Sequence, residues 1–275
     1  MYKIVSKRIL NNSVHMMDIE APLIAAKAKP GQFIILRIDE EGERIPLTIA
    51  GFNREGGTVK IIFQLVGKTT MHLGALEAGD EIRDFVGPLG KASELENYKN
   101  ACVIGGGLGT AIAYPQAKEL HRLGAKVDII AGFRNKDLII LEDEMKNISD
   151  NLYITTDDGS NGTKGFVTDV LKKNLETKTY DVVIAIGPLI MMKFVSKLTK
   201  DAGIKTIVSM NSVMVDGTGM CGGCRLTVGG ETKFACVDGP DFDGHLVDFD
   251  EAMMRGARYK TEEEHSCKLG GYLNG

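Results

Sequence analysis

The stretch ACVIGGGLGTAIAYPQAKELHRLG, residues 101–124, decides the fold class of this 275-residue chain. Residues 101–104 predict a short buried strand, a glycine loop follows, and residues 110–123 carry apolar side chains at helical spacing. Glycines between a strand and a helix let the backbone close on a pyrophosphate at the helix N-terminus. A tight turn is the simpler alternative. The candidate binding residues are Gly105, Gly106, Gly107, Gly109 and Thr110, with Thr110 in place of the third glycine of the usual pattern.

Downstream of this stretch, predicted strands alternate with predicted helices. The strands are expected at 126–132, 152–156, 181–188 and 205–210, and the clearest helices at 167–175 and 190–200. This alternation predicts a doubly wound parallel sheet, which binds ligands at the carboxyl ends of its strands. Asp157, Gly187 and Pro188 follow such strand ends and are further candidates, although Asp157 fits a turn or a helix cap equally well.

Upstream, short apolar runs are separated by turn signals. The clearest runs are 32–38, 45–50, 58–66 and 81–90, with a short helix expected near 71–76. Evenly spaced short strands with glycine-containing turns predict a closed or nearly closed antiparallel barrel. The polar segment 91–100 and a second change of pattern at 213 divide the chain into a barrel (1–98), an α/β domain (99–212) and a C-terminal module with its tail (213–275).

The C-terminal module is poor in apolar residues but contains three cysteines, at 221, 224 and 236, which favours a metal centre. The plant-type [2Fe–2S] pattern is C-x4-C-x2-C with a distant fourth cysteine, and its first position falls here on Asp216. Asp216, Cys221, Cys224 and Cys236 are therefore candidate cluster ligands. Cys267 in place of Asp216, a zinc site completed by His245 or Cys267, and inert buried cysteines are the alternatives. Cys102 is expected in the core.

Two barrel segments offer groups for a flavin. Arg44 precedes the β segment Pro46, Leu47 and Thr48, which can combine a cation for a diphosphate with a hydroxyl for a ring. Residues 66–70 could present backbone and hydroxyl groups to phosphate, from Val66, Gly67, Thr69 and Thr70. A plain surface arginine and a hairpin turn are the alternative interpretations.

Composition excludes several other classes of protein. The net charge of −4 provides no basic surface for nucleic acid, and no apolar run is long enough to cross a membrane. The N-terminus has no signal-peptide pattern, so we expect a cytoplasmic protein. The five histidines show no mutual spacing, and we find no Ser–His–Asp, paired-carboxylate or nucleophilic-cysteine arrangement, so no catalytic side chain is expected.

The order of barrel, nucleotide domain and cysteine module resembles the ferredoxin–NADP reductase superfamily. Within it, the segment MVDGTGMCGGCRLTVGGETKFACVDGPDFDGHLVDF (214–248) resembles electron-transfer subunits related to that of dihydroorotate dehydrogenase. It is most similar to the small subunits of electron-bifurcating NADH-dependent reduced ferredoxin:NADP oxidoreductases, where the aspartate is a cluster ligand.

The resemblance implies residue roles and a function. Arg44 would bind the FAD diphosphate, and Pro46, Leu47 and Thr48 would line the isoalloxazine, with Leu47 where many relatives have an aromatic residue. The turn at 87–90 and the loop at 105–111 also match, with Ile112 in place of a proline. The implied oxidoreductase subunit carries FAD and a [2Fe–2S] cluster, takes hydride from NADH, and forms a heterodimer with a larger flavin and [4Fe–4S] subunit related to the small subunit of glutamate synthase.

Two rival functions remain open at this point. A dihydroorotate dehydrogenase electron-transfer subunit would have the same cofactors and another partner. A non-catalytic, zinc-stabilised nucleotide-binding regulator would have neither flavin nor iron. The choice between NAD and NADP also stays open, because no cluster of arginines marks a site for a 2′-phosphate.

Overall fold

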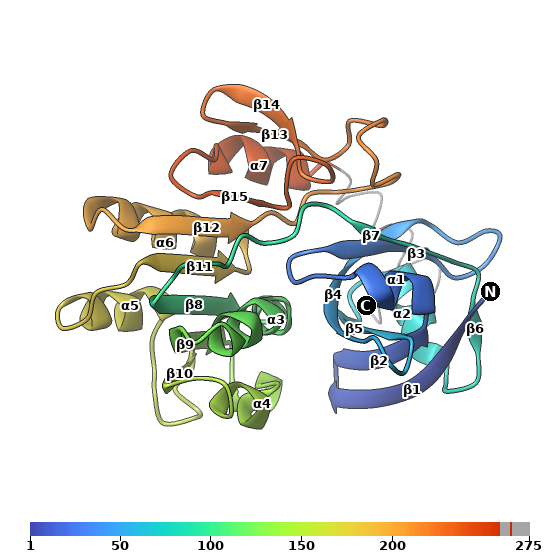
Figure 1. Ribbon diagram of the computed structural model, residues 1–275, viewed down its shortest axis with the longest axis horizontal. Coiled ribbons are helices and arrows are strands. Elements are labelled where there is room, and N and C mark those ends of the chain that lie inside the picture. The colour runs from blue at the N-terminus through green and yellow to red at the C-terminus, as the bar shows by residue number, and fades with distance from the viewer. Residues whose placement is uncertain (259–264, 266–275) are drawn as a thin grey trace.

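The computed structural model describes residues 1–258 and 265, and Cys267 therefore lies outside the described residues. Figure 1 shows an antiparallel barrel on the right, a parallel sheet with its helices on the left, and a small module above them. The expected combination of an antiparallel barrel with an α/β domain is confirmed. No helix in these residues is both long and apolar enough to cross a bilayer.

The barrel is one seven-stranded antiparallel sheet in the order β6-β1-β2-β5-β4-β3-β7. Its elements are β1 (Tyr2–Asn11), β2 (Val14–Glu20), α1 (Pro22–Lys27), β3 (Phe33–Arg37), β4 (Ile45–Asn53), β5 (Thr58–Gln64), α2 (Lys68–Ala75), β6 (Glu81–Ile82) and β7 (Asp84–Leu89). The single strand expected at 81–90 is wrong in detail. The segment forms two strands that pair with different neighbours: β6 pairs with β1, and β7 pairs with β3. Arg83 alone lies between them and connects the two edges of the sheet.

The sequence patterns had not singled out β1 and β2. Of the ten residues from Tyr2 to Asn11, seven either have a polar or charged side chain or are exposed to solvent. Only Ile4 is fully buried. A strand with one solvated face carries a weaker apolar signal than a fully buried one. Ile4, Met17 and Ile19 nevertheless belong to the barrel core together with Phe63.

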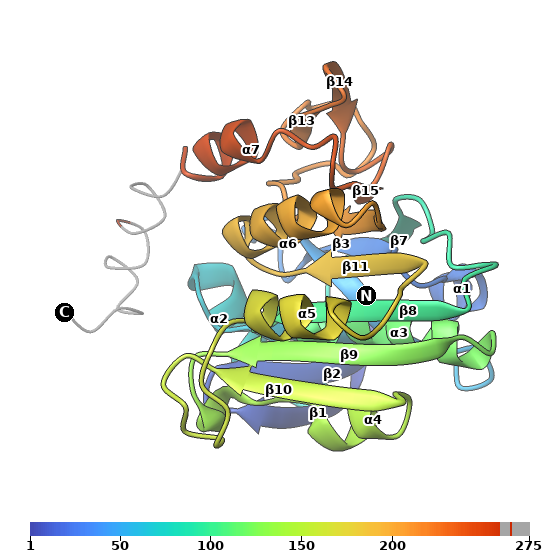
Figure 2. The ribbon, with the colours of Figure 1, turned by 90° about the vertical axis from the view of Figure 1, so that its left-hand side faces the viewer.

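The second sheet has the order β10-β9-β8-β11-β12-β15. Its elements are β8 (Asn100–Gly106), α3 (Gly109–Arg122), β9 (Lys126–Phe133), the 3-10 turn η1 (Lys136–Leu138), α4 (Glu142–Lys146), β10 (Asn151–Thr156), α5 (Val167–Leu175), β11 (Val182–Ile186), α6 (Leu189–Asp201) and β12 (Lys205–Ser209). The strands β8 to β12 are all parallel, as the alternation of strands and helices predicts. In Figure 2, α5 and α6 lie on the face of this sheet turned toward the viewer.

The C-terminal module contains β13 (Arg225–Val228), β14 (Glu231–Phe234), β15 (Asp241–Asp243) and α7 (Phe249–Gly256). The strands β13 and β14 form a hairpin, whereas β15 pairs antiparallel with β12. This small module therefore extends the sheet of the preceding domain across the proposed boundary at 212. It also shares a hydrophobic core with both other parts, since Ile35 of β3, Cys102 of β8 and Phe249 of α7 belong to one cluster.

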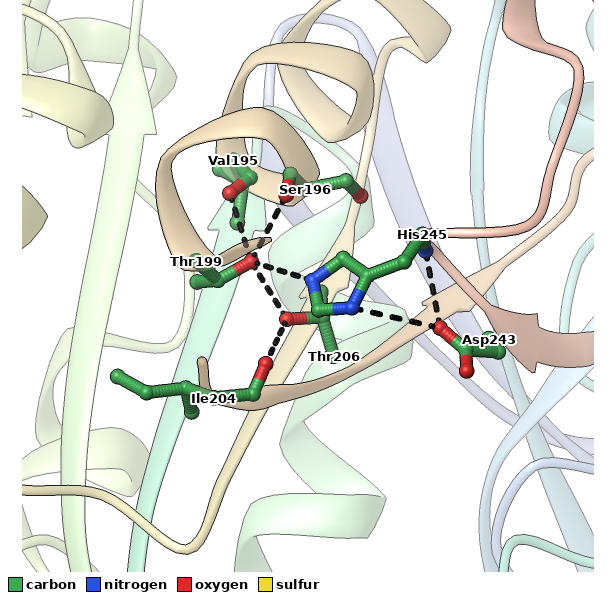
Figure 3. Close-up of polar contacts among 7 residues, drawn as sticks. All are labelled: Val195, Ser196, Thr199, Ile204, Thr206, Asp243 and His245. Atoms are coloured by element: carbon green, nitrogen blue, oxygen red, sulfur yellow. Dashed lines mark hydrogen bonds and ion pairs between the residues drawn. The ribbon is translucent and has the colours of Figure 1, made fainter. Parts of the chain in front are cut away.

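A buried polar network fastens the module to α6, as Figure 3 shows. The hydroxyl of Thr199 lies 3.2 Å from Nε2 of His245 and accepts a hydrogen bond from Oγ1 of Thr206 (2.6 Å). Thr199 itself donates to the carbonyl of Val195 (3.0 Å), so its oxygen is free to accept from the imidazole. The backbone N–H of His245 donates to Asp243 (2.9 Å). His245, considered above as a zinc ligand, thus has a partner within this network.

Candidate cofactor sites

The glycine loop after β8 is packed tightly against the start of α3 and the end of β11. A Cβ on Gly105 would lie 2.5 Å from Cα of Thr110, and a Cβ on Gly109 would lie 2.3 Å from the carbonyl oxygen of Ile186. Gly107 has a φ of +55°, in the left-handed region that favours glycine, with open space around it. The loop therefore needs its glycines for packing as well as for any ligand.

The structure brings this loop together with the end of β11. A Cβ on Gly106 would lie 2.9 Å from Cδ of Pro188, and a Cβ on Gly187 would lie 3.0 Å from Cα of Gly106. The hydroxyl of Thr110 is shielded from solvent and has no hydrogen-bond partner within the described chain. In the first turn of α3 the N–H groups of Thr110 and Ala111 already donate to the carbonyls of Gly107 (3.1 Å) and Leu108 (2.9 Å). The unpaired Thr110 hydroxyl at the N-terminus of α3 is therefore the donor that this loop offers to a ligand.

The end of β10 presents two adjacent carboxylates with different surroundings. Asp158 accepts a hydrogen bond from the N–H of Ser160 (2.9 Å), and hydrogen bonds from Ser160 lower the pKa of Asp158. The backbone N–H of Asp157 donates to the carbonyl of Phe133 (3.0 Å), at the end of β9. The loop therefore uses Asp158 for its own geometry and holds the backbone of Asp157 against the neighbouring strand.

The candidate flavin residues form two groups in the barrel. Pro46, Leu47 and Thr48 are half-buried on β4, and Arg44 precedes that strand. The second group is the N-terminus of α2, where Thr70 Oγ1 accepts hydrogen bonds from the N–H groups of Val66 (3.0 Å) and Gly67 (3.1 Å).

In the second group, the space beside Gly67 is empty, and the hydroxyl of Thr69 is already hydrogen-bonded. Gly67 has open space where a side chain would be. The hydroxyl of Thr69 donates to Glu43 (2.8 Å), the residue before Arg44. That contact connects the N-terminus of α2 to the segment that leads into β4, so both groups serve one region of the barrel.

The cysteines lie in a loop and in the hairpin that follows it. The sulfur atoms of Cys224 and Cys236 are 3.3 Å apart, and both residues are buried, whereas Cys221 is exposed. The backbone N–H of Cys236 donates to the sulfur of Cys224 (3.4 Å), and that of Gly223 to the sulfur of Cys221 (3.5 Å).

Asp216 belongs to the same loop. Its Oδ2 accepts a hydrogen bond from the N–H of Cys221 (2.8 Å). Across the described residues, no three Cys, His, Asp or Glu side chains form a preformed metal site. The structure thus brings two candidate ligands, Cys224 and Cys236, into contact and places Cys221 and Asp216 beside each other.

The chemistry of these donors fits an iron–sulfur centre. Burial and the neighbouring Cys224 raise the pKa of Cys236 to about 12, so the buried pair needs a positive partner before it can ionise. Gly217, Gly219 and Gly222 all have positive φ, which lets the loop curl without Cβ clashes. N–H groups aimed at sulfur are the interactions that stabilise thiolates on such a cluster.

The loop that carries Asp216 lies directly against the barrel. Nε of Arg44 donates to the carbonyl of Val215 (2.9 Å). A Cβ on Gly217 would lie 2.7 Å from Leu89 of β7 and 3.0 Å from Ile35 of β3. The candidate flavin strand and the candidate cluster loop are therefore neighbours.

Comparison with known proteins identifies the family. Residues 211–248 match the model of the iron-sulfur cluster binding domain of dihydroorotate dehydrogenase B. A Thermotoga maritima protein described as "Dihydroorotate dehydrogenase B (NAD(+)), electron transfer subunit homolog" is 47% identical over 264 residues, covering 96% of this chain and 93% of the relative. This chain belongs to that family of electron-transfer subunits and their homologues.

Two further relatives match over almost their whole length. An uncharacterised Clostridium beijerinckii protein from the adh 3′ region is 58% identical, with 96% of this chain and 92% of that protein covered. A chain solved in the structure of the NADH-dependent reduced ferredoxin-NADP oxidoreductase, a study of flavin-based electron bifurcation, is 46% identical with a TM-score of 0.93. That match covers 98% of this chain and 97% of the other. The expected relationship to a ferredoxin–NADP reductase-type electron-transfer subunit is confirmed.

Sequence patterns missed part of the region around the cysteines. Arg255, in the last turn of α7, donates to the carbonyl of Gly223 (3.4 Å), between Cys221 and Cys224. The sequence patterns did not predict the helix α7. Asp248 caps this helix by accepting from the N–H of Glu251 (2.9 Å), and an aspartate before an apolar-periodic segment is the signal that could have found it.

Proposed function

We propose that this chain is an electron-transfer flavoprotein subunit that exchanges electrons between NAD(H) and a [2Fe–2S] cluster, with FAD as the carrier in between. One observation carries the proposal: the 2.9 Å hydrogen bond from Arg44, beside the flavin strand, to Val215, beside the first candidate cluster ligand. It supports the placement of two redox groups next to each other, and bound FAD would supply the conversion between hydride transfer and single-electron transfer.

In this proposal the barrel binds and orients the flavin. Arg44 provides a cation for the diphosphate, and Pro46, Leu47 and Thr48 line the ring from β4. Val66, Gly67, Thr69 and Thr70 form the phosphate side at the start of α2, where the helix dipole favours negative charge. The hydrogen bonds that Thr70 Oγ1 accepts from the N–H groups of Val66 and Gly67 support a preshaped turn there.

The nucleotide domain would hold NAD(H) at the carboxyl ends of its parallel strands. The loop after β8 would approach the pyrophosphate through Gly105, Gly106, Gly107, Gly109 and Thr110. Gly187 and Pro188, after β11, would line the same site. Asp157 would accept from ribose hydroxyls. Two carboxylates at the end of β10 repel a 2′-phosphate, which supports NAD over NADP.

For the cluster, Asp216, Cys221, Cys224 and Cys236 would be the ligands, with three thiolates and one carboxylate. The family description of residues 211–248 supports an iron–sulfur centre in this segment over a zinc site.

We further infer a heterodimer in the cytoplasm with a larger flavin and [4Fe–4S] subunit, as part of a bifurcating NADH, ferredoxin and NADP⁺ complex. The 46% identity and 0.93 TM-score to the chain from the bifurcating oxidoreductase support this partner. A dihydroorotate dehydrogenase complex is the alternative, since the relative from Fusobacterium nucleatum described as its electron transfer subunit is 34% identical.

Anaerobic purification from the native host tests both levels of the proposal. We expect a visible flavin band, iron and acid-labile sulfide in equal amounts, and reduction of both groups by NADH. A colourless protein that contains zinc would overturn the redox function. The co-purifying chain, identified by mass spectrometry, decides the partner: a dihydroorotate dehydrogenase catalytic subunit would refute the bifurcating complex and leave the cofactors unchanged.

A further inference from the structure

Arg255 is a cation placed against the cysteine loop by a helix outside the matched family segment. It lies in the last turn of α7, and its Nη2 donates to the carbonyl of Gly223 at 3.4 Å. Gly223 is the second of the two glycines between Cys221 and Cys224. The guanidinium therefore reaches the part of the loop whose sulfur atoms are the candidate ligands.

The side chain of Arg255 has a donor without an acceptor. Its Nε is shielded from solvent and has no hydrogen-bond partner within residues 1–258. Buried donors are nearly always paired, so such an atom indicates an acceptor that residues 1–258 do not provide. Burial and the charges of Arg225 and Arg258 lower the pKa of Arg255, whereas Glu251 and the sulfur of Cys224 oppose that shift. A guanidinium stays charged throughout the physiological range.

The surroundings hold this cation in place. Phe249 and Ala252, on the buried face of α7, pack in the same core cluster as Cys224 and Cys236. The carboxylate of Glu251, also on α7, accepts a hydrogen bond from the backbone N–H of Thr227 (3.0 Å). No carboxylate in the described part of the chain forms an ion pair with Arg255, and the helix that carries Arg255 packs in the same cluster as two of the cysteines.

We propose that the Arg255 guanidinium faces the [2Fe–2S] cluster, donates its Nε–H to a cluster or cysteine sulfur, and raises the midpoint potential of the cluster. This inference rests on the proposed function. One-electron reduction makes the cluster one charge more negative, so a fixed cation and a hydrogen bond to sulfur stabilise the reduced form more than the oxidised form. Arg255 is in this sense a positioning and tuning residue, which holds no metal itself.

The test compares three variants of the full chain by redox titration of the cluster, followed by its electron paramagnetic resonance signal. Arg255→Gln should lower the midpoint potential while iron and sulfide content stay at the wild-type level. Arg255→Lys keeps the positive charge on a shorter, differently shaped group. It should lower the midpoint potential less than Arg255→Gln does. Arg258→Gln removes the same charge from an exposed site one turn further on and is the matched control, with a smaller shift than Arg255→Gln.

Each other outcome overturns the inference. An intact cluster at the wild-type potential in Arg255→Gln would refute it, as would equal shifts in Arg255→Gln and Arg258→Gln. If the glutamine variant holds no cluster, Arg255→Met, which matches the aliphatic stem, replaces it. Loss of the cluster in both, with retention in Arg255→Lys, would assign Arg255 to assembly of the loop. Failure of the proposed function is separate, because then the wild-type protein itself contains no iron–sulfur cluster.

Discussion

Asp216 binds its own loop through both carboxylate oxygens. Oδ1 accepts from the N–H of Thr218 (2.9 Å), and Oδ2 accepts from the N–H groups of Met220 (3.1 Å) and Cys221 (2.8 Å). These hydrogen bonds, that of Thr218 foremost, lower the pKa of Asp216 and keep it ionised at neutral pH. An anionic oxygen beside Cys221 suits a ligand to iron, and a hard oxygen in place of one thiolate changes the electronic structure of the cluster.

At this residue scale, replacing Asp216 tests the ligand assignment. Asp216→Cys should retain a [2Fe–2S] cluster with an altered visible spectrum and potential, because a thiolate replaces the carboxylate. Asp216→Ala should lose much of the cluster, measured as iron and sulfide per chain. Asp238→Ala is the control, since Asp238 also binds a backbone N–H, that of Phe234 (2.8 Å), but is no candidate ligand. An Asp216→Ala protein with an unchanged cluster would refute the assignment.

At the scale of elements, the strand–loop–helix unit from β8 to α3 combines tight packing with the candidate nucleotide site. Its glycines let the loop approach Ile186 and Gly187 at the end of β11, closer than any side chain would permit. The N-terminus of α3 therefore lies against the carboxyl end of β11. Ligands of open α/β sheets bind at the carboxyl ends of the strands.

Gly109→Ala should therefore disturb both the loop and the affinity for NADH. Its Cβ would lie 2.3 Å from the carbonyl of Ile186, so backbone must move. We expect at least about a tenfold loss of affinity, or about 1.4 kcal/mol, by titration calorimetry. Gly203→Ala is the control in the same domain: it has a φ of +67° with open space around it. It should cost about 1 kcal/mol of stability and leave affinity unchanged, so equal affinities for both variants would contradict the role of the loop.

The hydroxyl of Thr199 links α6 to β12 and to the turn after β15. Thr199→Val removes the oxygen that contacts both Thr206 and His245 while keeping the side-chain shape. We expect a loss of about 1–2 kcal/mol in the free energy of unfolding, because a buried hydrogen-bonding group loses its partner. Urea unfolding measures it, with Thr232→Val on the exposed face of β14 as a control that should change little. Equal effects of the two substitutions would contradict this role.

At the scale of the whole molecule, three parts of the chain meet at a buried carboxylate. Asp241 of β15 accepts hydrogen bonds from Ser93, in the segment after the barrel (2.6 Å), and from Gln116 of α3 (3.2 Å). Its other oxygen is buried and has no partner within the described chain. Burial raises the pKa of Asp241 above its usual value of 3.8. The junction between the barrel, the α/β domain and the C-terminal module thus contains one poorly solvated acid.

This junction predicts a pH dependence of stability. Because the pKa of Asp241 is raised in the folded protein, its contribution is fully present below the unfolded pKa, about 4, and is lost as pH rises through the folded value. Asp241→Asn cannot ionise, so its stability relative to wild type should increase from pH 5 to pH 8. Urea midpoints of both proteins at the two pH values measure this change. A difference that stays constant with pH would refute it.

Much of the architecture could be predicted because the signals lie in short contiguous segments. The glycine loop at 105–109 and the alternation that follows it indicated the parallel sheet, and the spacing of Asp216, Cys221 and Cys224 indicated the metal module. The strand β1 and the helix α7 escaped detection, since one has mostly solvated side chains and the other only eight residues. The pairing of β15 with β12 had no local signal either.

The sequence by itself determined the three-part order, the family and the candidate ligands, since each depends on residues near one another in the chain. Only the tertiary structure decided how these parts meet. The hydrogen bond from Arg44 to Val215 joins residues 171 positions apart, and Arg255 reaches Gly223 from a helix 32 positions away. Periodicity and spacing report local geometry, whereas such contacts arise when distant segments bury their apolar faces in a common core. That packing brings the candidate flavin strand and the cysteine loop together.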